Sequence, residues 1–167
     1  MTSTNEKAAE IVKRYTSAGE KIGTAESLTA GLISATIADI PGASNVLHGG
    51  HVVYCDEAKK QFLGVPSDIL EQYTAVSSQC AEAMVLGLLK SMPDIAVGVA
   101  VTGYAGPSGV SPDKDGLVYI SVARRKAGSS PNIKIIEKHF PGERNDVRQQ
   151  VVETALNCLL KFSPAQS

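Results

Sequence analysis

The sequence contains no tryptophan, and its five tyrosines and three phenylalanines make up only 5% of the 167 residues. This scarcity excludes a surface on which successive nucleic-acid bases could stack. Lysine and arginine together number 16 against 17 aspartates and glutamates, so the net charge of −1 leaves no basic excess for binding a phosphate backbone. We therefore expect no nucleic-acid partner.

Long apolar segments are also missing. No run approaches the roughly 18 residues that a membrane helix needs, and the polar N-terminus lacks the apolar segment of a signal peptide. The three cysteines, Cys55, Cys80 and Cys158, are odd in number and far apart, which is typical of a reducing compartment and not of a disulfide framework. The sequence thus predicts a cytoplasmic protein with no membrane partner.

Histidine is equally scarce. Only His48, His51 and His139 occur, and the first two have a loose metal-ligand spacing. No carboxylate or third ligand follows at a recognisable offset, so we interpret both as exposed on a strand or structural. The sequence predicts no bound metal and no cofactor.

What the chain does have is the composition of an ordinary globular domain. Hydrophobic residues make up 43% and charged residues 20% of the sequence. A chain of this length buries roughly two-thirds of its unfolded surface on folding. We expect a single domain over residues 1–167.

Helical and strand-like apolar spacings alternate along the chain. Helices are predicted from Ser3 to Gly19, from 28 to 38, from Asp56 to Gly64, from 66 to 72, after Ser77, and from 145 to 162. A first strand is predicted to end at Ile22, and four more are predicted over residues 46–54, 95–101, 117–122 and 133–136. The second of these five is interrupted by Gly49-Gly50. The last two are joined by a hairpin turn at 128–131. This order predicts an α/β fold with three layers, α/β/α, around one mixed, mostly parallel sheet.

Residues 23–31, Gly-Thr-Ala-Glu-Ser-Leu-Thr-Ala-Gly, are predicted to form a turn between a strand and a helix. The hydroxyls of Thr24 and Ser27 then fall at the first helical turn, where free backbone N–H groups can receive an anion or a developing oxyanion. Either hydroxyl could simply cap the helix, and spacing alone favours the cap over a nucleophile.

Three loops should meet at one edge of the sheet. The turn at Ser27, the segment 54–59 and the glycine-rich loop 102–109 each follow a predicted strand. In open α/β sheets the loops at the carboxyl ends of strands form a common crevice. The three segments can therefore line one pocket despite their distance in sequence.

Residues 24–31 (TAESLTAG) resemble the opening motif of the CinA C-terminal domain family, whose characterised members include bacterial nicotinamide-mononucleotide amidases. Three further stretches resemble the family in the same order: 54–59 (YCDEAK), 102–107 (TGYAGP) and 142–148 (GERNDVR). The resemblance extends to about Leu160. It implies a sheet of about five strands between helices, and an amidohydrolase that converts nicotinamide mononucleotide to nicotinic acid mononucleotide and ammonia.

The resemblance also implies roles for individual residues. Ser27 would be the nucleophile and Lys59 its base, with Tyr54 in the proton relay or beside the substrate. The implied substrate-binding residues are Thr24, Thr29, Gly31, Thr102, Gly103, Ala105, Gly106, Arg144 and Arg148. The two arginines, four residues apart on one helix face, could instead be structural partners of acidic residues.

A lysine base has a physical requirement. Its ordinary pKa of about 10.4 leaves too little neutral amine near pH 7, so Lys59 must be buried among apolar neighbours. The carboxylates of Glu26, Asp56 and Glu57 must then be turned away from it. The alternative is an ordinary surface lysine, as Lys60 is expected to be.

The resemblance further implies a pyridine mononucleotide as substrate and favours a homo-oligomer. A non-catalytic nucleotide-binding or regulatory module is the alternative, because full-length family members carry an additional N-terminal domain that this sequence lacks. Tyr104 and Val110 depart from the family's usual small residues in the 102–109 loop, and Ala30 replaces a usual glycine. These departures bear on the substrate more than on the nucleophile.

Overall fold

The computed structural model describes residues 2–164. Five strands form one mixed sheet in the order β2-β1-β3-β4-β5. β1 pairs in parallel with β2 and β3, whereas β4 pairs antiparallel with β3 and β5. The strands are β1 (Lys21–Glu26), β2 (Leu47–Val52), β3 (Ile95–Gly103), β4 (Leu117–Lys126) and β5 (Ser129–His139). Only β4 runs against the other four, so the predicted fold class is confirmed.

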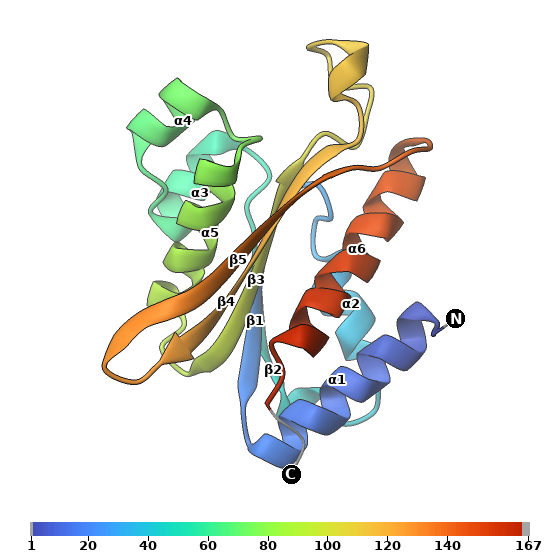
Figure 1. Cartoon of the computed structure of the whole chain (residues 1–167), viewed down its shortest axis with the longest axis vertical. Helices are drawn as coiled ribbons and strands as arrows, with labels where there is room; N and C mark the ends of the chain where they lie inside the picture. The colour runs from blue at the N-terminus through green and yellow to red at the C-terminus, as the bar shows by residue number, and fades with distance from the viewer. Residues whose placement is uncertain (1, 165–167) are drawn as a thin grey trace.

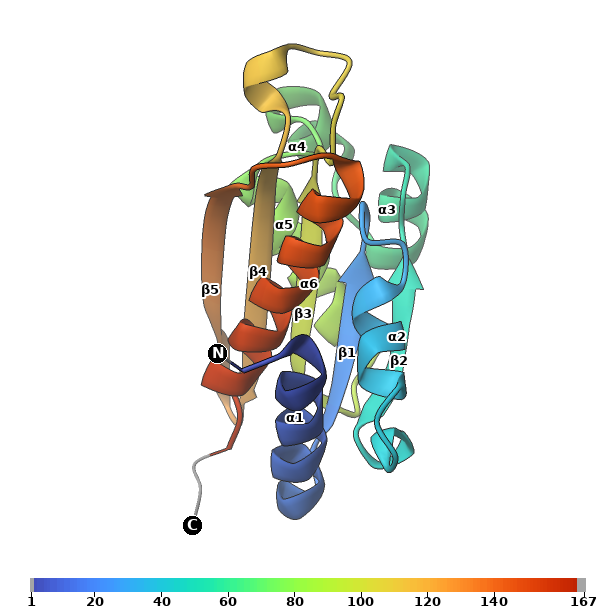
Figure 2. The ribbon, with the colours of Figure 1, turned by 90° about the vertical axis from the view of Figure 1, so that its right-hand side faces the viewer.

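Three helices cover each face of the sheet, as the two perpendicular views show (Figures 1 and 2). One face carries α1 (Thr4–Ala18), α2 (Leu32–Ala38) and α6 (Arg144–Lys161), and the other carries α3 (Asp56–Leu63), α4 (Ser67–Tyr73) and α5 (Ser78–Ser91). Two short 3-10 turns, Ala43–Asn45 and Pro112–Lys114, lie in connections. No helix within residues 2–164 is long and apolar enough to span a membrane.

Strand β3 is the centre of the sheet because both of its faces are buried. Val97, Val99 and Val101 pack into the cluster under α1, α2 and α6. Small residues face the other way, where α5 lies close: a Cβ on Gly98 would come within 2.9 Å of Leu88 Cδ2. Large side chains on one face and small ones on the other thus set how near each helix layer approaches.

The predicted helix ends are largely confirmed. Ser3 forms a capping box with Glu6, and Gly19 and Gly64 end α1 and α3 in the left-handed conformation that glycine adopts freely. Ser77 caps α5 by accepting a hydrogen bond from the N–H of Cys80. Asp56, however, is the first residue of α3 and Cys55 is its cap.

Two strand features differ from the prediction. The hairpin turn is shorter, because β4 and β5 continue until Lys126 pairs with Ser129 and leave two residues for the turn. Residues 129–131 therefore belong to β5, an edge strand that tolerates a proline. In β2 the bulge falls at His48, since Ile22 pairs with Leu47 and the next residue of β1 pairs with residue 49.

The protein itself approaches the second of the paired glycines closely. A Cβ on Gly50 would lie 2.3 Å from Thr24 Oγ1 and 2.9 Å from Ser34 Oγ. A larger residue at position 50 would therefore displace the hydroxyls that connect β1 to α2. The glycine therefore serves close packing beside the first motif.

Candidate active site

Helix α2 begins five residues after Ser27, so the prediction that Thr24 or Ser27 caps this helix is wrong. Residues 27–31 form a tight turn in which Ala30 has φ 50° and Gly31 has φ 98°. Gly31 is the residue before the helix and offers no capping side chain. Ser27 therefore has no role in capping α2.

The cap of α2 is supplied by Glu26 from the end of β1. Its carboxylate, 1% exposed, accepts hydrogen bonds from the N–H groups of Ile33 (2.8 Å) and Ser34 (3.1 Å) and from Thr24 Oγ1 (3.1 Å). A buried carboxylate at a helix N-terminus is stabilised by the helix dipole. It also occupies the N–H groups of α2 that the sequence had suggested for the oxyanion.

Glu26→Ala is expected to lower the free energy of unfolding by about 2–4 kcal/mol, because two buried N–H groups lose a charged acceptor. Glu26→Gln keeps one acceptor oxygen and should cost less. Chemical denaturation measures both, with Glu57→Ala, an exposed acid, as the control that should change stability by less than about 0.5 kcal/mol. Equal stability of Glu26→Ala and the control would contradict this assignment.

Ser27 and Lys59 are in direct contact despite a separation of 32 residues. Lys59 lies on the inner face of α3, is 2% exposed, and places Nζ 3.0 Å from Ser27 Oγ. The same nitrogen donates to the carbonyl oxygens of Val53 (2.9 Å) and Tyr54 (3.1 Å). Nζ is the donor in all three contacts, which the three N–H bonds of an ammonium can fill. In the neutral amine two N–H bonds remain for the carbonyls, and the lone pair is left for the serine hydroxyl.

Burial lowers the pKa of Lys59, and the nearby Cys80, Asp56 and Cys55 oppose this shift. The opposition from Cys80 is weak near neutral pH, since burial raises the pKa of its own thiol to about 11 and keeps it uncharged. Among residues 2–164 no carboxylate lies within 4.0 Å of the Lys59 ammonium. Lys60, by contrast, is partly exposed and pairs with Glu57 at 3.2 Å.

The turn that carries Ser27 is fixed to the central strand. The Ser27 N–H donates to the carbonyl of Val101 in β3 at 3.2 Å, and the side chain is 7% exposed. The next two N–H groups, of Leu28 and Thr29, have no hydrogen-bond acceptor within residues 2–164. These two donors belong to the two residues that follow Ser27 in the sequence.

Tyr54 reaches the pair through its backbone. Its carbonyl accepts from Lys59 Nζ, and it lies 3.5 Å from Ser27 Oγ. Its side chain is 55% exposed, and the phenol oxygen accepts a hydrogen bond from Arg144 Nη2 at 2.7 Å. The ring therefore extends toward α6, and within residues 2–164 its hydroxyl forms no hydrogen bond with either member of the pair.

Arg144 and Arg148 both lie at the start of α6 and bind main-chain oxygens. Arg144 Nη1 donates to the carbonyl of Gly106 at 3.1 Å, which joins the 102–109 loop to Tyr54. Arg148 donates to the carbonyls of the two residues after Ser27, at 2.9 and 3.3 Å. Arg148 thus holds the turn that carries Ser27, whereas Arg144 lies exposed at the start of α6.

The predicted threonines are buried and turned into the fold. Thr24 binds Glu26 and Ser34, and Thr102 donates to the carbonyl of Ala75 at 2.8 Å. Thr29 Oγ1 is buried without a partner among the described residues. Within residues 2–164 the hydroxyls of Thr24 and Thr102 thus already have partners in the protein.

The small residues predicted to bind substrate lie along two turns. Gly31 ends the turn that carries Ser27, and Ala105, 5% exposed, lies in the loop after β3. Gly103 ends β3 under close packing, since a Cβ there would be 2.7 Å from Leu117 O. Gly106 has φ 100° and accepts from Arg144.

Sequence reasoning missed two features. The carbonyls of Val53 and Tyr54 that hold Lys59 have no side-chain signature. Cys80 beside the amine could have been found, because the Ser77 cap places it on the first turn of α5, where its side chain is buried. Among residues 2–164 no group of three or more His, Cys, Asp or Glu side chains could hold a metal ion.

Comparison with known proteins identifies the family. The chain is 42% identical over 159 residues to a putative competence-damage inducible protein of Desulforamulus reducens, and 39% identical over 159 residues to a CinA-like protein of Thermotoga neapolitana. These alignments cover 95% and 94% of this chain and 37% of each relative, so the chain spans well under half the length of these curated relatives.

Solved structures of similar proteins have the same fold as this chain. The crystal structure of the competence/damage inducible protein CihA from Agrobacterium tumefaciens has 37% identity and a TM-score of 0.88, covering 95% of this chain and 94% of that one. A CinA superfamily protein from Klebsiella pneumoniae has 27% identity and a TM-score of 0.85, covering 95% and 96%. The CinA C-terminal domain matches residues 4–163. The chain therefore belongs to the CinA C-terminal domain family.

Proposed function

We propose that this domain is an amidohydrolase that converts nicotinamide mononucleotide to nicotinic acid mononucleotide and ammonia. The observation that carries the proposal is the buried contact between Ser27 Oγ and Lys59 Nζ, 3.0 Å long. A serine becomes a nucleophile only beside a base, and a lysine becomes a base near neutral pH only when burial lowers its pKa. Lys59 is buried beside Ser27 and this burial lowers its pKa, which supports the proposal, and the family includes amidases for this substrate.

In the proposed reaction Lys59 takes the proton of Ser27 as Oγ attacks the carboxamide carbon. The negative charge develops on the former carbonyl oxygen, and the free N–H groups of Leu28 and Thr29 are the proposed donors to it. Lys59 returns the proton to the departing nitrogen, so ammonia leaves and an ester with Ser27 remains. Water, deprotonated by Lys59, then hydrolyses this ester and regenerates the serine.

The nucleotide is proposed to be recognised at the rim of the site. Arg144 carries an exposed cation between the phenol of Tyr54 and the carbonyl of Gly106. A guanidinium can bind two phosphate oxygens at once, and this substrate adds a ribose phosphate to the amide-bearing ring. The mononucleotide should therefore bind far better than free nicotinamide.

The direct test is ammonia release from nicotinamide mononucleotide, with and without a chelator, and with free nicotinamide as the comparison. We expect release that survives the chelator and is much faster for the nucleotide. Loss of activity in chelator that zinc restores would contradict the serine–lysine mechanism. Tight binding without release would favour the alternative, a nucleotide-binding regulatory module.

Arg144→Met is expected to raise KM for the mononucleotide by roughly 10–100-fold, the value of one or two charge-assisted hydrogen bonds, with a smaller effect on kcat. Turnover of free nicotinamide should not change, since it has no phosphate. Lys138→Met, which removes an exposed cation from β5, is the matched control. An equal loss for both substrates would show that Arg144 supports the fold of the site and not the phosphate.

A further inference from the structure

Arg148, on the second turn of α6, holds two consecutive main-chain carbonyls with one edge of its guanidinium. Nε donates to the carbonyl oxygen of Leu28 at 2.9 Å, and Nη2 donates to that of Thr29 at 3.3 Å. The remaining nitrogen, Nη1, donates to Asn145 Oδ1 at 3.1 Å. The Nε–Nη2 edge, which can bind two oxygens of a phosphate, is therefore already filled by the protein.

The charge of Arg148 has no acidic partner. The side chain is half-buried, and within residues 2–164 no carboxylate lies within 4.0 Å of its guanidinium. All three of its contacts are with neutral groups, two peptide carbonyls and one side-chain amide. The field of this cation therefore acts on the peptide groups that follow Ser27.

The contact with Leu28 sets the direction of the next N–H group. The peptide bond between Leu28 and Thr29 is trans and planar, so the Leu28 carbonyl and the Thr29 N–H point in opposite directions. Helices α6 and α3 lie on opposite faces of the sheet (Figure 1). Because Arg148 holds the carbonyl on the side of α6, the Thr29 N–H is directed away from α6, toward the face on which α3 carries Lys59.

Different contacts therefore orient the two proposed oxyanion donors. The Leu28 N–H lies opposite the carbonyl of Ser27, which accepts a hydrogen bond from the Ala30 N–H at 3.1 Å within the turn. The Thr29 N–H depends on Arg148, which comes from the last helix of the chain. A cation at the carbonyl oxygen also polarises the peptide group, which makes the N–H at its other end a stronger donor.

We propose that Arg148 is a positioning residue, which orients and polarises the Thr29 N–H as a donor to the oxyanion and does not bind the substrate. This inference rests on the proposed amidase function. Preorganised donors stabilise the charge that develops in the transition state more than they stabilise the bound substrate. Arg148 therefore acts on kcat, whereas the exposed cation of Arg144 acts on KM.

The first test is steady-state ammonia release by Arg148→Met. For nicotinamide mononucleotide kcat should fall by roughly 10²-fold, the cost of losing one oxyanion donor, while KM stays within about threefold. Arg148→Lys keeps the charge but reaches only one carbonyl, so its kcat should lie between the two. A raised KM with normal kcat would show that Arg148 binds the substrate, and unchanged kinetics would show that it has no role in the reaction. Either result would overturn the proposal.

A probe without a nucleotide separates this inference from the proposed substrate. With p-nitrophenyl acetate, Ser27 Oγ bonds to the acetyl carbon, nitrophenolate leaves, and Lys59 takes the hydroxyl proton. Mass spectrometry locates the acetyl group, and Ser27→Ala gives the background rate. Acetylation of Ser27 should be slower in Arg148→Met by a factor similar to that in kcat.

The two proposals can then fail separately. Acetylation of Ser27 that depends on Arg148, without ammonia release from the mononucleotide, would contradict the proposed substrate and support the positioning role. Equal acetylation rates in the unaltered protein and Arg148→Met would overturn the positioning role, as would an unaltered protein that is not acetylated at Ser27.

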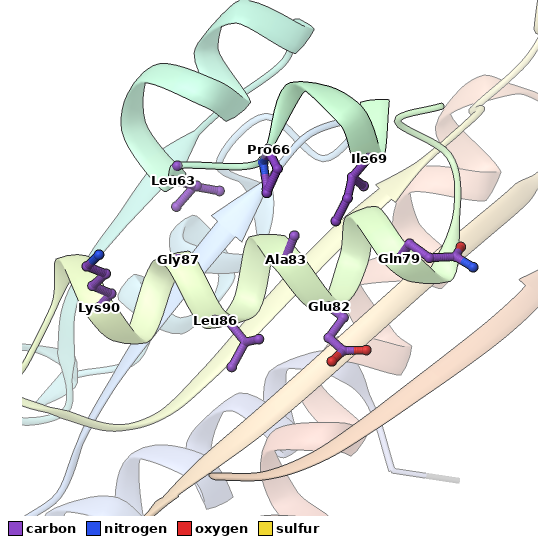
Figure 3. A pocket seen from close by; sticks show the side chains of 10 residues that line it. Leu63, Pro66, Ile69, Gln79, Glu82, Ala83, Leu86, Gly87 and Lys90 are labelled. Atoms are coloured by element: carbon purple, nitrogen blue, oxygen red, sulfur yellow. The ribbon is translucent and has the colours of Figure 1, made fainter. Parts of the chain in front are cut away.

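Two control variants distinguish positioning from support of the fold. Arg125 also donates to three main-chain carbonyls, but it does so around the start of β3, at the opposite end of this strand from Ser27. Arg125→Met should lower the melting temperature and leave kcat unchanged. Lys90→Met should change neither, since Lys90 lies at the apolar groove between α5 and the segment joining α3 and α4 (Figure 3). If Arg125→Met reduced kcat as much as Arg148→Met, the loss would reflect stability and the positioning role would be wrong.

Discussion

Ser27→Ala is expected to reduce turnover of nicotinamide mononucleotide by on the order of 10⁴-fold or more while the fold survives. Alanine cannot form the ester, and no other hydroxyl is held against Lys59 Nζ within residues 2–164. Steady-state ammonia release measures the loss, and thermal unfolding measures the fold. Stability should change by only about 1 kcal/mol, the value of one hydrogen bond.

Ser77→Ala is the matched control, because Ser77 is a helix cap and Ser27 is not. Ser77 Oγ accepts from the N–H of Cys80, so its removal should cost about 1 kcal/mol and leave turnover nearly unchanged. If Ser27→Ala behaved in the same way, with a modest loss of stability and normal turnover, Ser27 would not be the nucleophile. Hydroxylamine added to the active protein should also trap the acyl group as a hydroxamate, in place of its transfer to water.

Much of the fold could be predicted from the sequence because its signals are local. The apolar run 95–101 is flanked by turn residues and becomes the central strand β3. Ser3, Gly19, Gly64 and Ser77 act at helix ends through their own hydrogen bonds or backbone conformation. Such signals need only a few neighbouring residues, so they can be read without knowing the tertiary structure.

The start of α2 could not be predicted in this way. Thr24 and Ser27 have the local pattern of caps, whereas the actual cap is a glutamate on the preceding strand. Glu26 reaches N–H groups seven and eight residues later only because the turn at Ala30 and Gly31 reverses the chain. A tertiary arrangement therefore overrides the local preference.

The candidate site shows the same limit. Spacing along the chain cannot pair Ser27 with Lys59, and in the sequence analysis the pairing came from the family resemblance. The two carbonyl oxygens that accept hydrogen bonds from the amine belong to the main chain of Val53 and Tyr54. Main-chain groups are the same in every residue, so the sequence gives no signal for them. Burial of a lysine depends on the packing of α3 against α5, which is a property of the whole fold.

Lys59→Arg is expected to abolish turnover, by about 10³-fold or more, because a guanidinium remains protonated and cannot act as a base near neutral pH. Lys60→Arg is the matched control, since Lys60 is the neighbouring, partly exposed lysine that pairs with Glu57. It should leave turnover within about twofold. Near-normal turnover in Lys59→Arg would mean that Lys59 is not the base.

The pH dependence gives a second, independent measure of the same amine. Burial lowers the pKa of Lys59 in the folded protein, so turnover should rise with pH until the amine is neutral and then level off. Asp56, Cys55 and Cys80 oppose this shift, and Cys80 stays neutral below about pH 11. Turnover that does not rise with pH anywhere in the range where the protein is folded would contradict a lysine base.

The same lowered pKa should make the free energy of unfolding depend on pH. Between the folded pKa of Lys59 and the ordinary value of about 10.4, the unfolded chain binds more protons than the folded protein, so the free energy of unfolding rises with pH. One such group contributes at most about 1.4 kcal/mol per pH unit, and the contribution is lost as the pH falls through the folded pKa. Lys59→Met should lack this slope.

The absolute stability of Lys59→Met is less informative than its slope, because methionine removes a costly buried amine but also leaves the Val53 and Tyr54 carbonyls without their donor. The decisive measurement is the difference in unfolding free energy between the unaltered protein and Lys59→Met across this pH range. The unaltered protein should become more stable relative to Lys59→Met as the pH rises. A constant difference would mean that Lys59 titrates like an exposed lysine, and a protonated Lys59 could not activate Ser27 at neutral pH.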